Sequence, residues 1–95
     1  MSQIKLGSWF FDNAEFDPEH DVLYLSMGEP RPGYGEESAE GHILRYDEEG
    51  EFCGVTLIGV RGILDSGGYV DVSLPPRTFP RREVLTGGDL RKVLA

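Results

Sequence analysis

The segment Asp17-Pro-Glu-His-Asp-Val-Leu-Tyr-Leu-Ser-Met27 carries the clearest structural signal in the chain. Pro18 fixes φ for the first position of a turn, and the Asp17 carboxylate can accept hydrogen bonds from the backbone that follows. After the turn, apolar residues recur with a period of two, which is typical of a β-strand. The segment therefore predicts a turn between a short strand at Ala14–Phe16 and a longer strand at Val22–Met27.

Three further segments alternate in the same way and predict strands at His42–Tyr46, Phe52–Ile58 and Tyr69–Leu74. Asp47-Glu-Glu-Gly50 joins the first two of these strands as a turn, with Gly50 supplying a positive φ. In the second of them, the alternation places Cys53 with the core residues and Phe52 on the opposite face.

The connecting segments are less regular. Gly28–Gly41 is polar and long for a hairpin loop, so we expect a mobile loop there. Gly59–Gly67 suits one helical turn, and a helix is permitted from about Asp89, a plausible N-cap, onward. No element is assigned to residues 1–11.

Length and composition place these elements in one small domain. The chain has 95 residues, of which 39% are hydrophobic, with 13 glycines and 6 prolines, whereas domains commonly span about 50 to 200 residues. We expect a single α+β domain over residues 1–95. Its centre is an antiparallel β-meander of four to five strands, with one or two short helices near the C-terminus. The core occupies about 14–74, and a basic segment follows at 75–95.

Charge is divided unevenly along the chain. The formal net charge is −8. Residues 1–74 contain fifteen acids and four bases, a net −11, whereas residues 75–95 contain two acids and five bases, a net +3. An acidic body disfavours general binding to nucleic acids or anionic membranes. Arg77, Arg81 and Arg82 are a minor candidate for nucleic-acid contact, although this basic segment is better explained by packing against the acidic body.

Several other classes of protein are disfavoured. A lone Cys53 excludes an intrachain disulfide framework. No apolar run approaches the ~18 residues of a membrane span, and the N-terminus lacks the layout of a signal peptide, so we expect a cytoplasmic protein. The glycine-rich segments match no phosphate-binding pattern, and no cofactor is expected.

The acidic and histidine residues do not form a recognisable metal or catalytic motif. Asp17, Glu19 and Asp21 alternate as at the start of a calcium-binding loop, but the required glycine and glutamate are missing at the sixth and twelfth positions. The remaining candidate ligands lack the spacing of known metal sites: His20, His42 and Cys53. The sequence therefore assigns no catalytic, cofactor-binding or metal-binding residue.

The second face of the predicted sheet is unexpectedly apolar, because it carries Tyr24, Ile43, Phe52 and Ile58. An antiparallel sheet with one solvated face should be polar there, and large exposed apolar patches are uncommon on monomers. Either the chain's own Trp9–Phe11 and Leu90–Leu94 cover this face, or a partner protein does. The internal cover is the more ordinary explanation, and the four residues are otherwise candidate partner-binding residues.

The motifs also carry a resemblance to a known family. Phe16-Asp-Pro-Glu-His-Asp-Val-Leu-Tyr-Leu25, Gly41-His-Ile-Leu-Arg-Tyr-Asp-Glu-Glu-Gly50 and Val55-Thr-Leu-Ile58 resemble the small prokaryotic domain-of-unknown-function family twenty-two eighty-three, over about residues 16–64. Phe16 replaces the usual tyrosine, and Arg45 stands where an acid is common. The family has no established activity, cofactor or catalytic residue to transfer.

Some members of the family are encoded beside small RNase-like toxins, so the resemblance implies an antitoxin or accessory role for those members. We read the motif residues themselves as structural, forming two turns: Asp17, Pro18, Asp21, Asp47 and Gly50. The leading hypothesis is a non-enzymatic protein-interaction module, either a homodimer or an antitoxin-like partner of a small basic protein. The alternative is a small hydrolase or metal-assisted enzyme that uses carboxylates and a histidine near the 28–41 loop.

Overall fold

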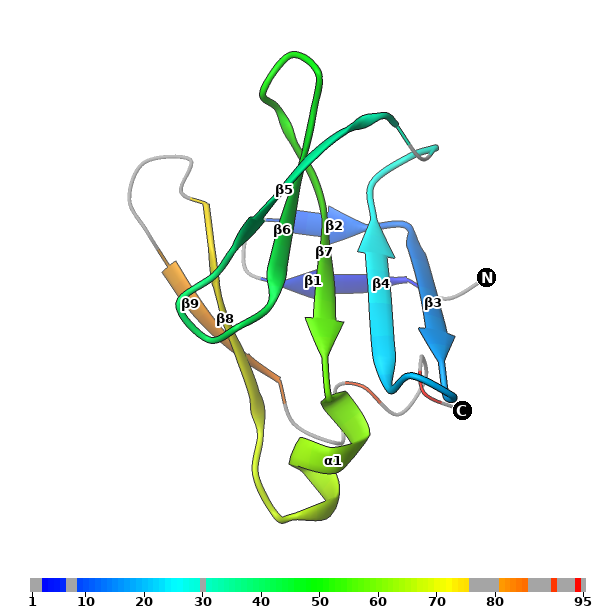
Figure 1. The fold of residues 1–95 in the computed structure, drawn as a ribbon, viewed down its shortest axis with the longest axis vertical. Coiled ribbons are helices and arrows are strands. Elements are labelled where there is room, and N and C mark those ends of the chain that lie inside the picture. Colours follow the sequence, from blue (N-terminus) through cyan, green and yellow to red (C-terminus); the bar gives the residue numbers. More distant parts are fainter. Residues whose placement is uncertain are drawn as a thin grey trace.

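A computed structural model of the protein describes residues 3–6, 9–29, 31–75, 81–85, 90 and 94. Figure 1 shows their arrangement. The elements, in chain order, are β1 (Ile4–Leu6), β2 (Trp9–Phe11), β3 (Asn13–Asp17), β4 (Val22–Ser26), β5 (Gly33–Glu37), β6 (Ile43–Asp47), β7 (Phe52–Ile58), α1 (Val60–Asp65), β8 (Val70–Leu74) and β9 (Arg81–Leu85).

The centre of the fold is a five-stranded sheet in the order β3-β4-β7-β6-β5, in which every neighbouring pair is antiparallel. Two hairpins, β1–β2 and β8–β9, form separate two-stranded sheets. The predicted α+β class is confirmed. Both ends of each strand predicted from alternation lie within one residue of the ends observed in the structure. The helical turn expected between Gly59 and Gly67 is α1, and Gly67 has a φ of +85°. None of the described helices is long and apolar enough to cross a membrane.

One face of the five-stranded sheet, here called the core face, carries the buried side chains of Leu23, Leu25, Val55 and Leu57, each at most 2% exposed. Both hairpins pack on this face, and Figure 1 shows β1 and β2 running across the strands of the larger sheet. The residues that complete the core from outside the sheet are Leu6, Phe11, Val60, Val70, Val72, Leu74, Leu85, Leu90 and Leu94.

The expectation that the chain's own ends cover the second face of the sheet is wrong. Phe11, Leu90 and Leu94 are buried in the same cluster as Leu23 and Leu57, so they cover the core face instead. The reason is that the core face presents the continuous rows of leucine and valine, which bury more apolar area than the interrupted second face.

The placement of Phe52 and Cys53 also differs from the prediction. Arg45 pairs with Gly54 whereas Tyr46 pairs with Phe52, so Cys53 is the extra residue of a β-bulge. A bulge reverses the alternation beyond it, and Phe52 therefore enters the core, where its ring lies 4.9 Å from that of Trp9. Cys53 is buried but lies outside the main core cluster.

The expected 28–41 loop contains an edge strand. Gly33–Glu37 forms β5, which pairs with β6 in register, with Gly35 opposite Arg45. The alternation rule missed this strand because two of its five residues are glycine and two are glutamate.

Parts of the C-terminal prediction lie outside the described residues. Arg77, Asp89 and Val93 are among these, as is most of the helix expected from Asp89 onward. Of Arg81 and Arg82 the structure describes the backbone alone, which belongs to β9.

Replacing Leu25 by aspartate tests the assignment of the two faces. Leu25 is 2% exposed, so Leu25→Asp removes packing and buries an unpaired charge, and should lower the free energy of unfolding by at least about 3 kcal/mol. The control is Tyr24→Asp in the same strand, where the side chain is 47% exposed and the expected loss is about 1 kcal/mol or less. Urea unfolding curves measure both. Equal losses in the two variants would contradict the assignment.

Candidate functional site

The Asp17–Asp21 turn begins with a carboxylate that organises its own backbone. Asp17 Oδ1 accepts hydrogen bonds from the N–H groups of Glu19 (3.0 Å) and His20 (3.3 Å). Its Oδ2 lies 2.8 Å from His20 Nδ1, and this side-chain hydrogen bond is the main reason that the pKa of Asp17 falls below its ordinary value. Asp17 thus builds the turn between β3 and β4.

Asp21 connects this turn to the end of β7. Its carboxylate accepts hydrogen bonds from the N–H groups of Arg61 (2.8 Å) and Gly62 (2.9 Å) at the start of α1, and its carbonyl accepts one from Gly59 N–H (2.8 Å). Asp21 itself has a φ of +55°, a conformation that aspartate tolerates better than most residues. The second aspartate of the motif therefore holds the β7–α1 junction, a contact across forty residues of sequence.

Asp47 organises the β6–β7 turn in a similar way. Its Oδ1 accepts hydrogen bonds from the N–H groups of Glu49 (2.9 Å) and Glu51 (3.0 Å), and Gly50 has a φ of +82°. Its Oδ2 forms a 2.9 Å ion pair with Arg31, whose other nitrogen donates to the Met27 carbonyl (3.2 Å). Arg31 thereby fastens the segment before β5 to this turn.

His42 and Glu40, the histidine and carboxylate near the predicted 28–41 loop, form hydrogen bonds that connect separate parts of the fold. His42 is 3% exposed, and its Nδ1 accepts a hydrogen bond from Ile58 N–H (3.0 Å). Burial lowers the pKa of His42, opposed by the negative charges of Glu40 and Asp71. Glu40 accepts hydrogen bonds from the Ser73 N–H (2.9 Å) and hydroxyl (2.7 Å), which join the β5–β6 turn to β8. Both side chains therefore accept hydrogen bonds that connect separate parts of the fold.

One exposed cluster could offer three metal ligands. Ligand atoms of Asp17, Glu19 and His20 lie within 4.8 Å of one another. The third member is therefore His20, whereas the calcium-loop pattern in the sequence had Asp21 in that place. The hydrogen bonds of Asp17 within the turn account for this proximity without an ion.

The second face of the five-stranded sheet, here called the outer face, remains exposed. Cross-strand pairing aligns one row across all five strands: Glu15, Tyr24, Thr56, Ile43 and Glu37. A parallel row contains Val22 and Ile58. Tyr24 and Ile58 are 47% and 43% exposed, and Val22 and Ile43 are half-buried. We call these four apolar residues the outer strip.

Three of the four candidate partner-binding residues therefore share this exposed face. Tyr24, Ile43 and Ile58 belong to the outer strip, whereas Phe52 is in the core because of the bulge. The Ile43 side chain packs over Gly35 of the edge strand. A Cβ at Gly35 would lie only 2.8 Å from the Cγ2 atom of Ile43. Gly35 thus allows the strip to extend to β5.

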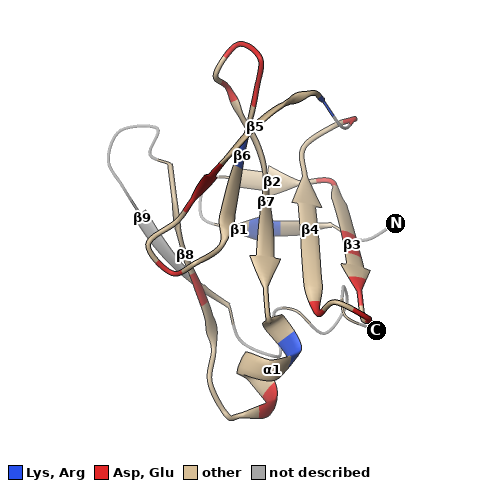
Figure 2. Ribbon diagram, viewed as in Figure 1, with Lys and Arg blue, Asp and Glu red and all other residues tan. Residues whose placement is uncertain are grey.

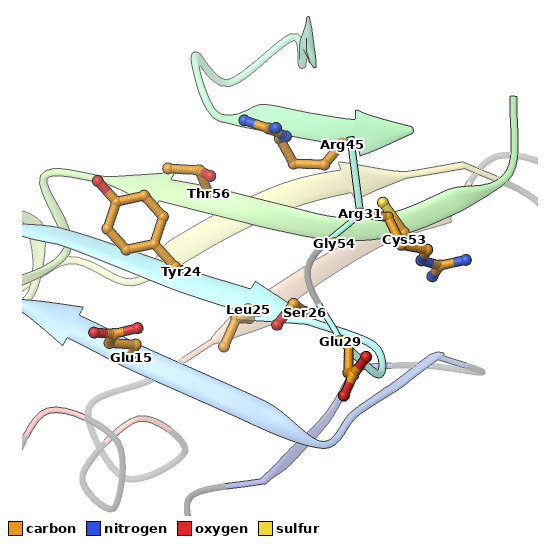
Figure 3. A pocket seen from close by; sticks show the side chains of 10 residues that line it. All are labelled: Glu15, Tyr24, Leu25, Ser26, Glu29, Arg31, Arg45, Cys53, Gly54 and Thr56. Atoms are coloured by element: carbon orange, nitrogen blue, oxygen red, sulfur yellow. The ribbon is translucent and has the colours of Figure 1, made fainter. Parts of the chain in front are cut away.

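A cleft of about 300 Å³ opens beside the outer strip. Figure 3 shows Tyr24, Thr56 and Cys53 directed to the same side of the sheet, with Arg45 above them and Leu25 directed to the other side. Neither histidine lines this cleft. The cleft offers an aromatic ring, a hydroxyl, two guanidinium groups and the carboxylates of Glu15 and Glu29 to a docked side chain.

Acidic residues surround the outer face. The ribbon in Figure 2 is coloured for Asp and Glu on β3, on β5 and in turns that connect the strands, and the basic residues that line the cleft are Arg31 and Arg45. Arg31 is neutralised by Asp47, so Arg45 carries the remaining positive charge near the cleft. The sequence had indicated the apolar strip and the overall charge, but not their position on one surface.

The fold and this surface define a small, mainly antiparallel β-domain with one covered and one open sheet face. A family model described as a protein of unknown function (DUF2283) matches residues 13–61, just over half of the chain, and the protein belongs to this family. The matched region spans the complete five-stranded sheet and reaches Arg61, whose backbone Asp21 holds. Comparison with curated proteins and with solved structures gave no significant match.

The Glu40–Ser73 contact predicts a defined acid dependence. Partial burial alone would raise the pKa of Glu40, but the hydrogen bonds from Ser73 outweigh it and lower the pKa to about 2. Since the ordinary pKa of a glutamate is 4.5, the contribution of this carboxylate to stability is complete above pH 4.5 and is lost as the pH falls towards 2. The difference in unfolding free energy between the parent and Glu40→Gln should therefore shrink over that range.

The same contact can be checked residue by residue. In Ser73→Ala the hydroxyl donor is absent, and an NMR titration should show the pKa of Glu40 moving up towards its ordinary value. An unchanged pKa in Ser73→Ala, or a parental pKa near 4.5, would show that the turn is not attached to β8 in this way.

Proposed function

We propose that the protein is a non-enzymatic protein-interaction module that binds a small basic protein through its outer face, as an antitoxin binds its toxin. The observation that supports this most directly is the outer strip, a partly exposed apolar surface flanked by Glu15 on one edge strand and Glu37 on the other. Burying such a row against a partner gains about 25 cal/mol for each Å² of apolar surface removed from water.

The charge of the protein favours a basic partner over a second copy. Two copies would each bring a net charge of −8, which opposes their association. A basic protein instead meets carboxylates at both ends of the strip, which accelerates encounter and selects the orientation of binding. The homodimer remains the competing outcome of the experiment below.

The alternative enzyme has less support from the described residues. A hydrolase or metal-assisted enzyme would need a histidine and a carboxylate that converge on a substrate cleft. His42 is instead engaged with Ile58, Glu40 is engaged with Ser73, and His20 pairs with Asp17 on an exposed turn.

The experiment is to co-express the chain with any small basic protein encoded beside its gene, purify the complex that forms and measure its dissociation constant. Tyr24→Ala combined with Ile58→Ala should weaken binding by at least about tenfold, because both side chains are exposed in the free protein and would be buried centrally in the complex. The matched control is Tyr69→Ala, which removes an equally exposed aromatic side chain (54%) outside the five-stranded sheet.

Two results would contradict the proposal. One is the failure of any basic neighbour to co-purify with the parent. The other is equal binding by the outer-strip double variant and the Tyr69→Ala control. Light scattering at micromolar concentrations tests the competing homodimer, which would require the parent to be dimeric and the double variant to be monomeric.

A further inference from the structure

The outer face alone is small for a stable protein complex. Five strands about 4.8 Å apart and about five residues long present a flat area of only roughly 300 Å². Standard complexes bury about 800 Å² on each partner. A partner bound to the outer face must therefore also contact the rim of the sheet.

The rim includes two edge strands, β3 and β5, and β5 is the more exposed of the two. All five residues of Gly33–Glu37 are exposed, and β5 has a paired neighbour on one side only. The Ser38 N–H donates to the His42 carbonyl (2.7 Å), which places this pair among the hydrogen-bonded pairs of the antiparallel ladder. Because such pairs alternate, the backbone groups of Gly33, Gly35 and Glu37 point away from β6.

This edge is both accessible and already ordered. Two of its three outward-facing residues are glycines, which have no side chain to obstruct an approaching backbone. On the other side of the strand, the rings of Tyr34 and Tyr46 stack with a centroid distance of 5.4 Å and an interplanar angle of 17°. The stack helps to hold β5 in register, so a strand that joins it need not first order it.

The charge of β5 selects the kind of strand that can join it. Glu36 and Glu37 are consecutive, so they project towards opposite faces of the sheet. Opposite charges on neighbouring strands stabilise a pair, and like charges destabilise it. A second copy would add two more glutamates to this edge, whereas two consecutive basic residues would place one cation near each carboxylate.

We propose that β5 is a strand-addition site, at which an extended basic segment of a partner protein pairs with Gly33–Glu37 and continues the five-stranded sheet. This inference rests on the proposed function, because it specifies how the basic partner is held. Backbone pairing supplies the contact area that the outer strip lacks, and the lysine or arginine side chains supply the selectivity.

The probe is a synthetic ten-residue peptide of threonine and valine with a central pair of lysines. On binding, NMR hydrogen exchange should slow at the amides of Gly33, Gly35 and Glu37, with little change at Tyr24 and Ile58. One control peptide carries N-methyl groups on alternate amides, and a second has glutamates in place of the lysines. Both should bind at least about tenfold more weakly, because the first cannot complete the ladder and the second meets like charges.

Two variants separate the backbone effect from the charge effect. Glu37→Pro removes an edge N–H that does not bond to β6, so β5 should remain paired while peptide binding falls by at least about tenfold. Glu37→Gln keeps the N–H and removes the charge, and should weaken binding by only about two- to fourfold.

Three results would overturn the inference: equal binding of the N-methylated peptide, equal affinities of the two Glu37 variants, and exchange protection of Gly35 that grows with protein concentration before any peptide is added. The last result would identify a second copy as the occupant. None of these experiments changes a residue of the outer strip, so the strand-addition site can fail while binding of the basic protein through Tyr24 and Ile58 survives.

Discussion

The chain is too short to cover both faces of its five-stranded sheet with apolar residues, and the rest of the structure depends on this limit. A domain of 95 residues buries a modest fraction of its surface, and here the described hairpins, together with Leu90 and Leu94, are all placed on one face of the five-stranded sheet. That choice completes a core around Leu23 and Leu57, both fully buried. It also leaves Tyr24 and Ile58 exposed on the other face, and the functional proposal follows from this asymmetry.

The β-bulge at Cys53 determines to which face of the sheet Phe52 points. By shifting the register between Arg45 and Tyr46, it directs Phe52 into the aromatic group with Trp9 and Phe11. Gly54 is required beside the bulge, because a Cβ there would lie 2.5 Å from the Leu25 carbonyl oxygen. One extra residue thus moves a large ring from the expected docking surface into the core and narrows the outer strip.

Local patterns in the sequence were sufficient to predict much of this fold. Strands such as β4 and β8 alternate cleanly, and the turns at Asp17 and Asp47 follow from side chains that bond to the backbone nearby. The position of Phe52 could not be predicted, because a bulge depends on the register of the neighbouring strand. β5 was missed because glycine and glutamate give no apolar alternation. The helix contact of Asp21 was also missed, since its partners are forty residues away.

The candidate site was therefore foreseen in part. The apolar excess on a second face was evident from Tyr24, Ile43 and Ile58, but the sequence favoured cover by the chain's own ends. Deciding between cover and exposure requires knowing where the β1–β2 hairpin packs, and hydrophobic residues such as Phe11 have no preference for one apolar face over another beyond the area that they bury.

The exposure of the outer face is the central claim, and NMR with a neutral, soluble gadolinium chelate tests it most directly. The chelate broadens signals from protons near the surface. In dilute solution, the Tyr24 ring and the Ile58 methyl groups should be strongly broadened, whereas the methyl groups of Leu23 and Leu57 should be unaffected. Equal protection of Tyr24, Ile58 and the two leucines would show that the outer face is already covered, and would contradict the account.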